Sequence, residues 1–188
     1  ITTLIGNKFG SLGLSPTFWS AIAFALAILS SILFGISKFL DANDIMFPSQ
    51  IIASILLLIS GFFDVVDGCV ARVLNKSTPK GAFLDSNFDK ISEALIFIGI
   101  AIGGLSNPIV AMIALSSSIL VSYLRARSES LGIELKGVGV GERAERLVIL
   151  SICGLIPIPG SIQWGVIIII FLSIFSFIQR FWFVLKRL

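Results

Sequence analysis

The stretch from Gly61 to Asp89, GFFDVVDGCVARVLNKSTPKGAFLDSNFD, places four carboxylates within or beside apolar segments on both sides of a short polar connection. These carboxylates are Asp64, Asp67, Asp85 and Asp89. A carboxylate at membrane depth costs roughly 2.5 kcal/mol or more, so it usually faces a cavity or a partner. Four such groups so close in sequence indicate a site that binds cations.

The rest of the chain predicts an all-α membrane protein with six transmembrane helices. Its 188 residues are 56% hydrophobic and 13% charged, which is too apolar for an ordinary soluble domain. Apolar stretches that approach or exceed the roughly 20 residues needed to cross a membrane fall at 15–37, 49–72, 82–105, 108–131, 145–159 and 162–184. The fifth is short and contains Pro157, and we expect it to begin near Glu142 and Arg146 in the headgroup zone and to be helical throughout. No repeat or linker interrupts the chain, so residues 1–188 are predicted to form one domain.

Residues 1–14 allow two interpretations. Ile1, Leu4, Ile5, Phe9 and Leu12 recur at helical spacing, which is typical of a juxtamembrane helix lying along the membrane surface. The same residues also suit a frayed start to the first span. The sequence does not choose between them.

The basic residues predict the orientation. Of 14 Lys and Arg residues, only Lys38 falls on one side of the predicted spans, and most of the others lie on the opposite side. Cytoplasmic loops carry an excess of Lys and Arg, so we predict a multi-pass protein of the cell membrane with both termini and the aspartate site facing the cytoplasm. The net charge of +3 is then a topology signal, and no nucleic-acid partner is predicted.

The aspartates share helix faces with small residues. At about 100° per residue, Asp64, Asp67 and Gly68 fall in one arc with Ala71 and Arg72. In the next span, Gly81, Asp85 and Asp89 recur every four residues. The connection between the spans is short, so the two helices are predicted to be antiparallel neighbours whose acids meet at similar depth.

Facing carboxylates are hard oxygen ligands of the kind that Mg²⁺ or Mn²⁺ prefers. The chain has no histidine, so carboxylates are left to serve as metal ligands and as base. A pair of ions held this way would clamp a phosphate during in-line displacement. Considered alone, the acids also fit ion-pairing anchors or the proton or cation relay of a transporter.

The spacing from Asp64 to Asp89 resembles the signature of the CDP-alcohol phosphotransferase family, D-x-x-D-G-x-x-A-R-x8-G-x-x-x-D-x-x-x-D, at every specified position. The resemblance implies six transmembrane helices, a homodimer, and transfer of a phosphatidyl-type group from a CDP-linked lipid to an alcohol with release of CMP. It implies that Asp64, Asp67, Asp85 and Asp89 form a site for two divalent ions, Mg²⁺ or Mn²⁺. Asp89 is also implied to be the catalytic base that takes the proton of the acceptor hydroxyl.

The same resemblance assigns the CDP-lipid site to six residues: Asp64, Asp67, Gly68, Ala71, Arg72 and Gly81. In this assignment, Gly68 and Ala71 leave room for the cytidine and Arg72 supports the nucleotide end. Gly81 allows close approach near its helix.

Two further segments, SYLRARSE at 122–129 and GERAERL at 141–147, resemble the branch of the family that uses an inositol phosphate. The resemblance implies an acceptor-phosphate pocket of Ser122, Arg125, Arg127, Arg143, Arg146 and Arg180. It departs from the bacterial pattern at Ala144, where those members carry proline, and at Arg125, which is often lysine. The implied partners are inositol 1-phosphate, the membrane lipid, and CDP-archaeol or CDP-diacylglycerol, with the archaeal members as the closest match.

Two other functions remain for comparison. Within the family, glycerol 3-phosphate would also suit a phosphate pocket. Outside it, a divalent-cation transporter is expected to carry its acids on interrupted helices in corresponding halves, whereas these acids lie in adjacent helices of one half. Catalysis is the prediction.

Overall fold

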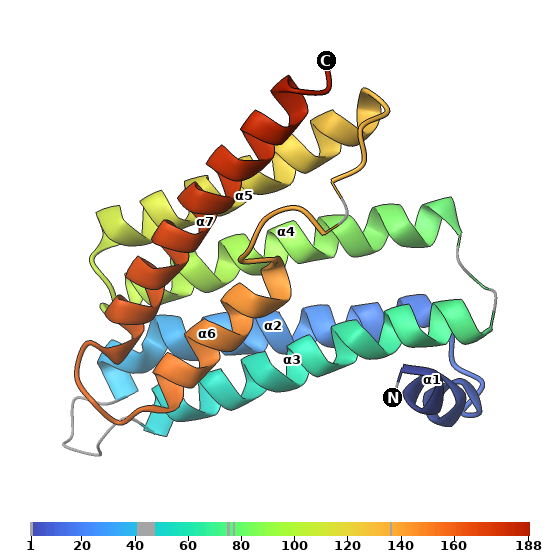
Figure 1. Cartoon of the computed structure of the whole chain (residues 1–188). Helices are drawn as coiled ribbons and strands as arrows, with labels where there is room; N and C mark the ends of the chain where they lie inside the picture. The colour runs from blue at the N-terminus through green and yellow to red at the C-terminus, as the bar shows by residue number, and fades with distance from the viewer. Residues whose placement is uncertain (1, 41–47, 75, 77, 136) are drawn as a thin grey trace.

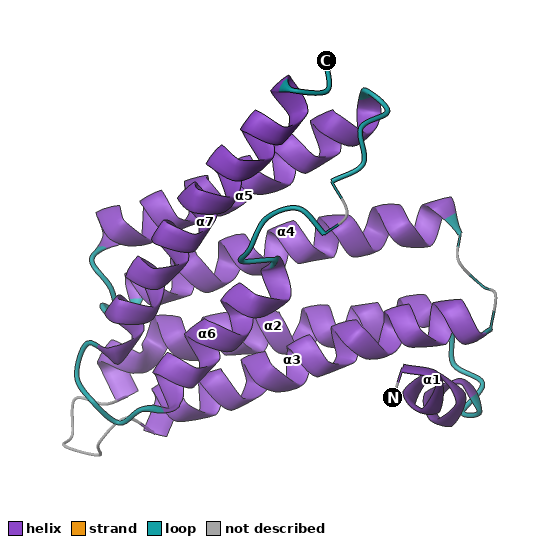
Figure 2. Ribbon diagram, viewed as in Figure 1, coloured by secondary structure: helices purple, strands orange, loops and turns teal. Residues whose placement is uncertain are grey.

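The computed structural model describes residues 2–40, 48–74, 76, 78–135 and 137–188, and within these ranges it is helical with no strand (Figures 1 and 2). The helices are α1 (Thr2–Gly10), α2 (Pro16–Leu40), α3 (Pro48–Val73), α4 (Pro79–Ile102), α5 (Pro108–Ser130), α6 (Arg143–Leu155) and α7 (Ser161–Leu185). The predicted all-α class is confirmed. The positions of the predicted spans agree with α2 to α7 to within a few residues.

Proline determines where several helices begin. Four of them start at a proline, namely α2, α3, α4 and α5, and the first helical position is the one where the missing N–H is not needed. Side chains cap three of these starts. At α2, the Ser15 hydroxyl accepts from the Phe18 N–H at 3.2 Å. The Thr78 hydroxyl accepts from the Gly81 N–H at 3.0 Å, and the Asn107 side-chain oxygen accepts from the Ile109 N–H at 2.9 Å.

Four helices are long and apolar enough to cross a membrane: α2, α3, α5 and α7. The protein is therefore a membrane-embedded helical protein. Among the remaining helices, α4 carries Asp85, Asp89 and Lys90 in its first half and Glu93 just beyond its middle, and α6 has only 13 residues.

The helix α6 begins at Arg143, close to its predicted start, but it ends earlier than predicted. It stops at Leu155, and Ile156 has an extended backbone (φ −80°, ψ 116°), which is the conformation favoured before a proline. The prediction of a helix continuing to residue 159 is wrong. Figure 1 shows that α6 begins part-way along α4, and Arg146 is only 2% exposed, so its side chain is buried between helices. The position of this end in the headgroup zone stays a prediction.

The helix α2 packs against both α3 and α4. Ser30 and Ser60 donate to the carbonyls of Ala53 and Ala23, both at 2.7 Å, and so tie α2 to α3. Such interhelical bonds stabilise helix pairs in apolar surroundings. As predicted, α3 and α4 run antiparallel (Figure 1), but each packs chiefly on α2 and not on the other. This arrangement leaves space between the aspartate-bearing faces of α3 and α4.

The helix α1 lies across the end of α3 (Figure 1). Gly6 makes this approach close, because a Cβ there would lie 2.8 Å from the Cys69 carbonyl oxygen. Phe9 packs edge-on against Trp19, with ring centroids 5.2 Å apart. A frayed start to the first span is therefore excluded, since α1 is a separate helix that ends at Gly10.

Candidate active site

Three of the predicted aspartates converge. Asp64 and Asp67 of α3 and Asp85 of α4 each offer a carboxylate oxygen, and these oxygens lie within 4.8 Å of one another. An all-carboxylate donor set at this spacing fits a hard divalent cation such as Mg²⁺ or Mn²⁺. These three residues are thus able to hold a metal ion.

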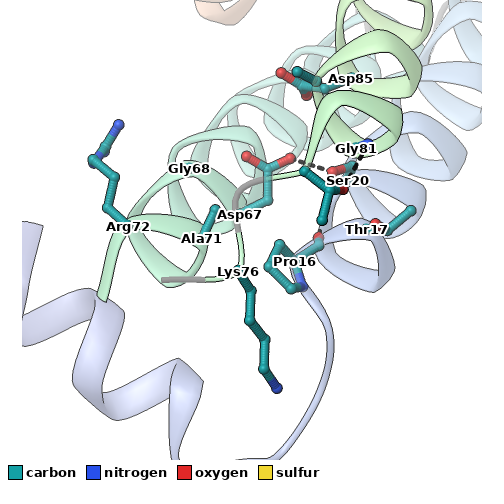
Figure 3. A pocket seen from close by; sticks show the side chains of 12 residues that line it. Pro16, Thr17, Ser20, Asp67, Gly68, Ala71, Arg72, Lys76, Gly81 and Asp85 are labelled. Atoms are coloured by element: carbon teal, nitrogen blue, oxygen red, sulfur yellow. Dashed lines mark hydrogen bonds between the residues drawn. The ribbon is translucent and has the colours of Figure 1, made fainter. Parts of the chain in front are cut away.

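Asp67 is oriented from α2. The Ser20 hydroxyl donates to Asp67 Oδ2, and Figure 3 shows the two side chains meeting at the wall of a cavity. Asp67 is buried, so this bond satisfies an oxygen that water reaches poorly. Ser20 was not named from the sequence, because nothing local in α2 signals its contact with α3.

Asp89 lies beside this group and is bridged to it by Arg143. Arg143 Nη1 donates to Asp64 Oδ2 at 3.0 Å and also pairs with Asp89 Oδ1. The side chain of Arg143 is 13% exposed, and its Nε has no hydrogen-bond partner among the described residues. The first residue of α6 therefore connects α3 and α4 through their carboxylates.

A first cavity of about 200 Å³ opens beside Asp67 and Asp85, as Figure 3 shows. Small side chains leave it open, and its lining includes Gly68, Ala71, Gly81, Thr17, Arg72 and Lys76. Five of the six residues predicted to bind the CDP-lipid line this cavity. The sixth, Asp64, lies outside it and faces the third cavity described below.

A second cavity of about 470 Å³ lies between α4, α5, α6 and α7. It shares Ala82 and Asp85 with the first cavity, and Asp89 lines only the second. Its cationic wall consists of Lys90, Arg125, Arg143, Arg146 and Arg180, with Ser122 alongside. The structure thus brings together five of the six residues predicted for the acceptor phosphate.

Arg127, the sixth, does not line this cavity. It stands two positions after Arg125, about 200° around the helix, and its Nη1 contacts Ser130 Oγ at 3.5 Å. Residues at i and i+2 do not share a helix face.

Arg146 is held by Glu93, a buried acid that was not predicted from the sequence. Glu93 Oε1 accepts from Arg146 Nε at 2.9 Å and from Nη2 at 2.6 Å, and both residues are 2% exposed. A signal was present in the sequence, since Glu93 lies just ahead of the apolar run of α4 and a buried acid needs a partner. Lys90 also approaches it, with Nζ 3.9 Å from Glu93 Oε2.

A third cavity of about 250 Å³ runs between α3 and α6. Its lining is mainly apolar, with Leu57, Phe62, Leu147 and Val148, and it reaches Asp64. The aspartates therefore adjoin three cavities of different chemistry. One has small and polar walls, one has a cationic wall, and one is apolar.

Residues 11–186 match the profile of the CDP-alcohol phosphatidyltransferase family. The chain therefore belongs to this family and is a transferase. It is 36% identical over 184 residues to the archaetidylinositol phosphate synthase of Pyrococcus horikoshii, covering 98% of this chain and 90% of that protein. It is 44% identical over 143 residues to the enzyme of the same name from Methanothermobacter thermautotrophicus, covering 74% of this chain and 73% of that protein.

Solved structures show the same fold. The crystal structure of Mycobacterium tuberculosis phosphatidylinositol phosphate synthase with CDP-DAG bound superposes with a TM-score of 0.78 at 25% identity, covering 98% of this chain and 93% of that one. A second structure of that synthase, in complex with manganese and citrate, gives a TM-score of 0.77 at 25% identity, covering 98% and 88%. The aspartate cluster of this chain fits the use of a divalent metal.

Proposed function

We propose that this protein transfers an archaetidyl or diacylglycerol phosphate group from a CDP-linked lipid to a hydroxyl of inositol 1-phosphate and releases CMP. The observation that carries this proposal is the meeting of three cavities at the four aspartates. A phosphoryl-type transfer between a nucleotide-linked lipid and a phosphorylated alcohol needs three such compartments around one reacting phosphorus.

The CDP-lipid takes the first and third cavities. In the first, Gly68 and Ala71 leave room for the cytidine, and Arg72 and Lys76 offer positive charge. The hydrocarbon chains leave along the apolar cavity between α3 and α6, which reaches Asp64. The pyrophosphate then lies next to the aspartates, where we infer that two divalent ions, Mg²⁺ or Mn²⁺, are held by Asp64, Asp67, Asp85 and Asp89.

The acceptor takes the second cavity. Arginine suits a phosphate because its planar fork donates two parallel hydrogen bonds, and four arginines line this cavity. The acceptor hydroxyl then points toward Asp85 and Ala82, where the first and second cavities meet.

Asp89 serves as the base because it lines the acceptor cavity and is absent from the lining of the first. It accepts the proton of the acceptor hydroxyl. The hydroxyl oxygen forms a bond to the lipid-linked phosphorus, the bond from that phosphorus to the CMP oxygen breaks, and CMP leaves with the electron pair. Divalent ions at the aspartates would neutralise the charge of the pyrophosphate. Arg143, which contacts Asp64 and Asp89, lies next to the reacting groups.

We further propose that α2 to α7 all cross the cell membrane as one domain, that α1 lies on its cytoplasmic face, and that two copies form a homodimer. For α4, support comes from Asp85, Asp89 and Lys90, which line the cavities and so do not require contact with lipid. The orientation with cytoplasmic termini rests on the basic residues near one end of the bundle, among them Arg72, Arg125 and Arg187.

The test is CMP release by the purified protein with CDP-archaeol or CDP-diacylglycerol and a panel of alcohols. Inositol 1-phosphate should react fastest, and free inositol should be almost inert, because each charge-assisted bond to the phosphate contributes roughly 1.5–3 kcal/mol. Faster reaction with glycerol 3-phosphate, or equal use of free inositol, overturns the assigned acceptor.

Two neighbouring arginines provide a matched pair for the acceptor cavity. Arg125→Gln should raise the KM for the acceptor, because Arg125 lines the cavity. Arg127→Gln removes the same charge from a residue outside the lining and should change this KM little. Equal increases in this KM for the two variants would mean that Arg127 also contributes to the phosphate site.

A further inference from the structure

Two arginines of the acceptor cavity are bonded to one short backbone segment, Val138–Gly141. Arg180 of α7 donates from Nε to the Val138 carbonyl at 2.8 Å. Arg146 of α6 donates from Nη1 to the Gly141 carbonyl at 2.7 Å. Arg180 and Arg146 are 3% and 2% exposed, so both guanidinium groups depend on protein partners for their orientation.

The path of this segment depends on glycine. Gly139 and Gly141 have φ values of +96° and +76°, and Gly137 just before the segment has +75°. Residues with a Cβ rarely adopt this left-handed region. The backbone that directs the two carbonyls toward the arginines is therefore encoded by the alternating glycines of the sequence GVGVG at 137–141.

The segment is anchored to the start of α6. Glu145 Oε2 accepts from the N–H of Gly141 at 2.6 Å and from the N–H of Glu142 at 3.0 Å, as in a capping box. Since Arg143 in the same turn bridges Asp64 and Asp89, the carbonyls of the segment are fixed relative to the aspartate site.

The two arginines differ in what they still offer a ligand. A guanidinium has five N–H donors. Arg146 uses three of them, on Glu93 and Gly141, and Glu93 neutralises its charge. Arg180 uses its Nε on Val138, and since the guanidinium is planar, this single bond orients the two Nη groups that remain.

We propose that the segment Val138–Gly141 is a positioning element for the acceptor phosphate. Its carbonyls hold Arg180, and secondarily Arg146, in the orientation that binds the phosphate in the second cavity. This inference rests on the proposed function, in which that cavity takes a phosphorylated alcohol.

Gly139 gives the sharpest test because of its surroundings. A Cβ on Gly139 would lie 2.7 Å from Arg180 Nε and 2.6 Å from Ser176 Oγ, whereas a Cβ on Gly137 would meet no described atom within 4 Å. Gly139→Ala and Gly137→Ala therefore both place a Cβ on a residue with positive φ, and only the first displaces Arg180.

The experiment measures steady-state KM values for inositol 1-phosphate and for the CDP-lipid with the purified full-length protein and both variants. Gly139→Ala should raise the KM for inositol 1-phosphate by about tenfold or more, the loss expected for one charge-assisted hydrogen bond. Its KM for the CDP-lipid should stay near that of the wild type, and Gly137→Ala should change neither constant. An unchanged acceptor KM in Gly139→Ala, or equal increases in both variants, overturns the proposal.

If Gly139→Ala fails to fold, a second pair of variants, at Ser176 of α7, tests the same contact between Gly139 and Arg180. Ser176→Val adds bulk against Gly139 without altering the conformation of the segment, and it should raise the acceptor KM. Ser176→Ala only removes a hydroxyl that has no hydrogen-bond partner among the described residues and should match the wild type. Identical kinetics for the two Ser176 variants overturn the proposal.

The choice of acceptor is separable from this inference. If the wild type prefers glycerol 3-phosphate, the assigned acceptor is wrong, and the same variants are then assayed with glycerol 3-phosphate. The same separation of the two KM values is expected there, because the segment acts on the phosphate. Its absence with the preferred acceptor overturns the positioning role.

Discussion

Glu93→Gln should destabilise the protein far more than the same substitution of an exposed glutamate. The substitution keeps an oxygen that accepts from Arg146 but removes the negative charge. Both partners are 2% exposed and are joined by bonds of 2.9 Å and 2.6 Å, so the guanidinium would be left as an uncompensated buried charge.

The expected loss in the free energy of unfolding is about 3 kcal/mol, at the lower end of the 3–5 kcal/mol typical for breaking a buried pair. The lower end applies because the amide oxygen still accepts one hydrogen bond. The chain contains a matched control in Arg125 and Glu129, a pair of the same residue types at 3.0 Å whose side chains are both 50% exposed. Glu129→Gln should cost less than about 1 kcal/mol.

The measurement is reversible unfolding by SDS in mixed micelles, followed by the fluorescence of the three tryptophans. Combining Glu93→Leu with Arg146→Met should recover at least about half of the loss, since replacing a buried ion pair by apolar residues is often neutral. A loss below about 1 kcal/mol for Glu93→Gln, or one equal to that of Glu129→Gln, would refute the idea that this buried pair needs its charge.

Three further predictions concern catalysis. Chelation should abolish CMP release and Mg²⁺ or Mn²⁺ should restore it, because the clustered carboxylates repel one another without a cation. Full activity in metal-free buffer would contradict the metal site. Asp89→Asn should lower kcat by about 100-fold or more, with CDP-lipid binding retained. Asp64→Asn should instead weaken metal and nucleotide binding. Near-normal turnover in Asp89→Asn would mean that another group activates the acceptor hydroxyl. Gly68→Val should raise the KM for the CDP-lipid by projecting into the first cavity. Gly68→Ala should be tolerated, because the atoms nearest to its Cβ belong to the flexible Arg72 side chain, at 3.6 Å or more. Equal KM values for the two variants would argue against the nucleotide in that cavity.

The helices were predictable because each apolar run is bounded by proline or by polar residues, and both act locally. The end of α6 was also predictable, because Pro157 disfavours helical backbone at Ile156, but the prediction followed the apolar residues beyond this proline instead. The packing partners of α3 and α4 could not be predicted from the sequence. Their closeness in sequence predicts direct packing, whereas the bonds made by Ser30 and Ser60 show α2 packed on α3 instead.

The aspartate cluster was predictable because its members lie at helical spacing on either side of one turn. The role of Glu93 was not, because its partner Arg146 lies 53 residues away and on another helix. Arg125 and Arg127 show a different limit of prediction from a sequence motif. The motif assigns both residues to the phosphate pocket, but helix geometry places only Arg125 in the cavity.

In the proposed reaction, the cavities around the aspartates receive their substrates from two different phases. The apolar cavity between α3 and α6 would take lipid from the bilayer, where abundance is a mole fraction, and the arginine-lined cavity would take its acceptor from water, where abundance is a molarity. Diluting the CDP-lipid with inert lipid therefore slows the reaction at constant total amount, while the acceptor responds only to its bulk concentration. Membrane composition and the soluble pool then control the same reaction independently.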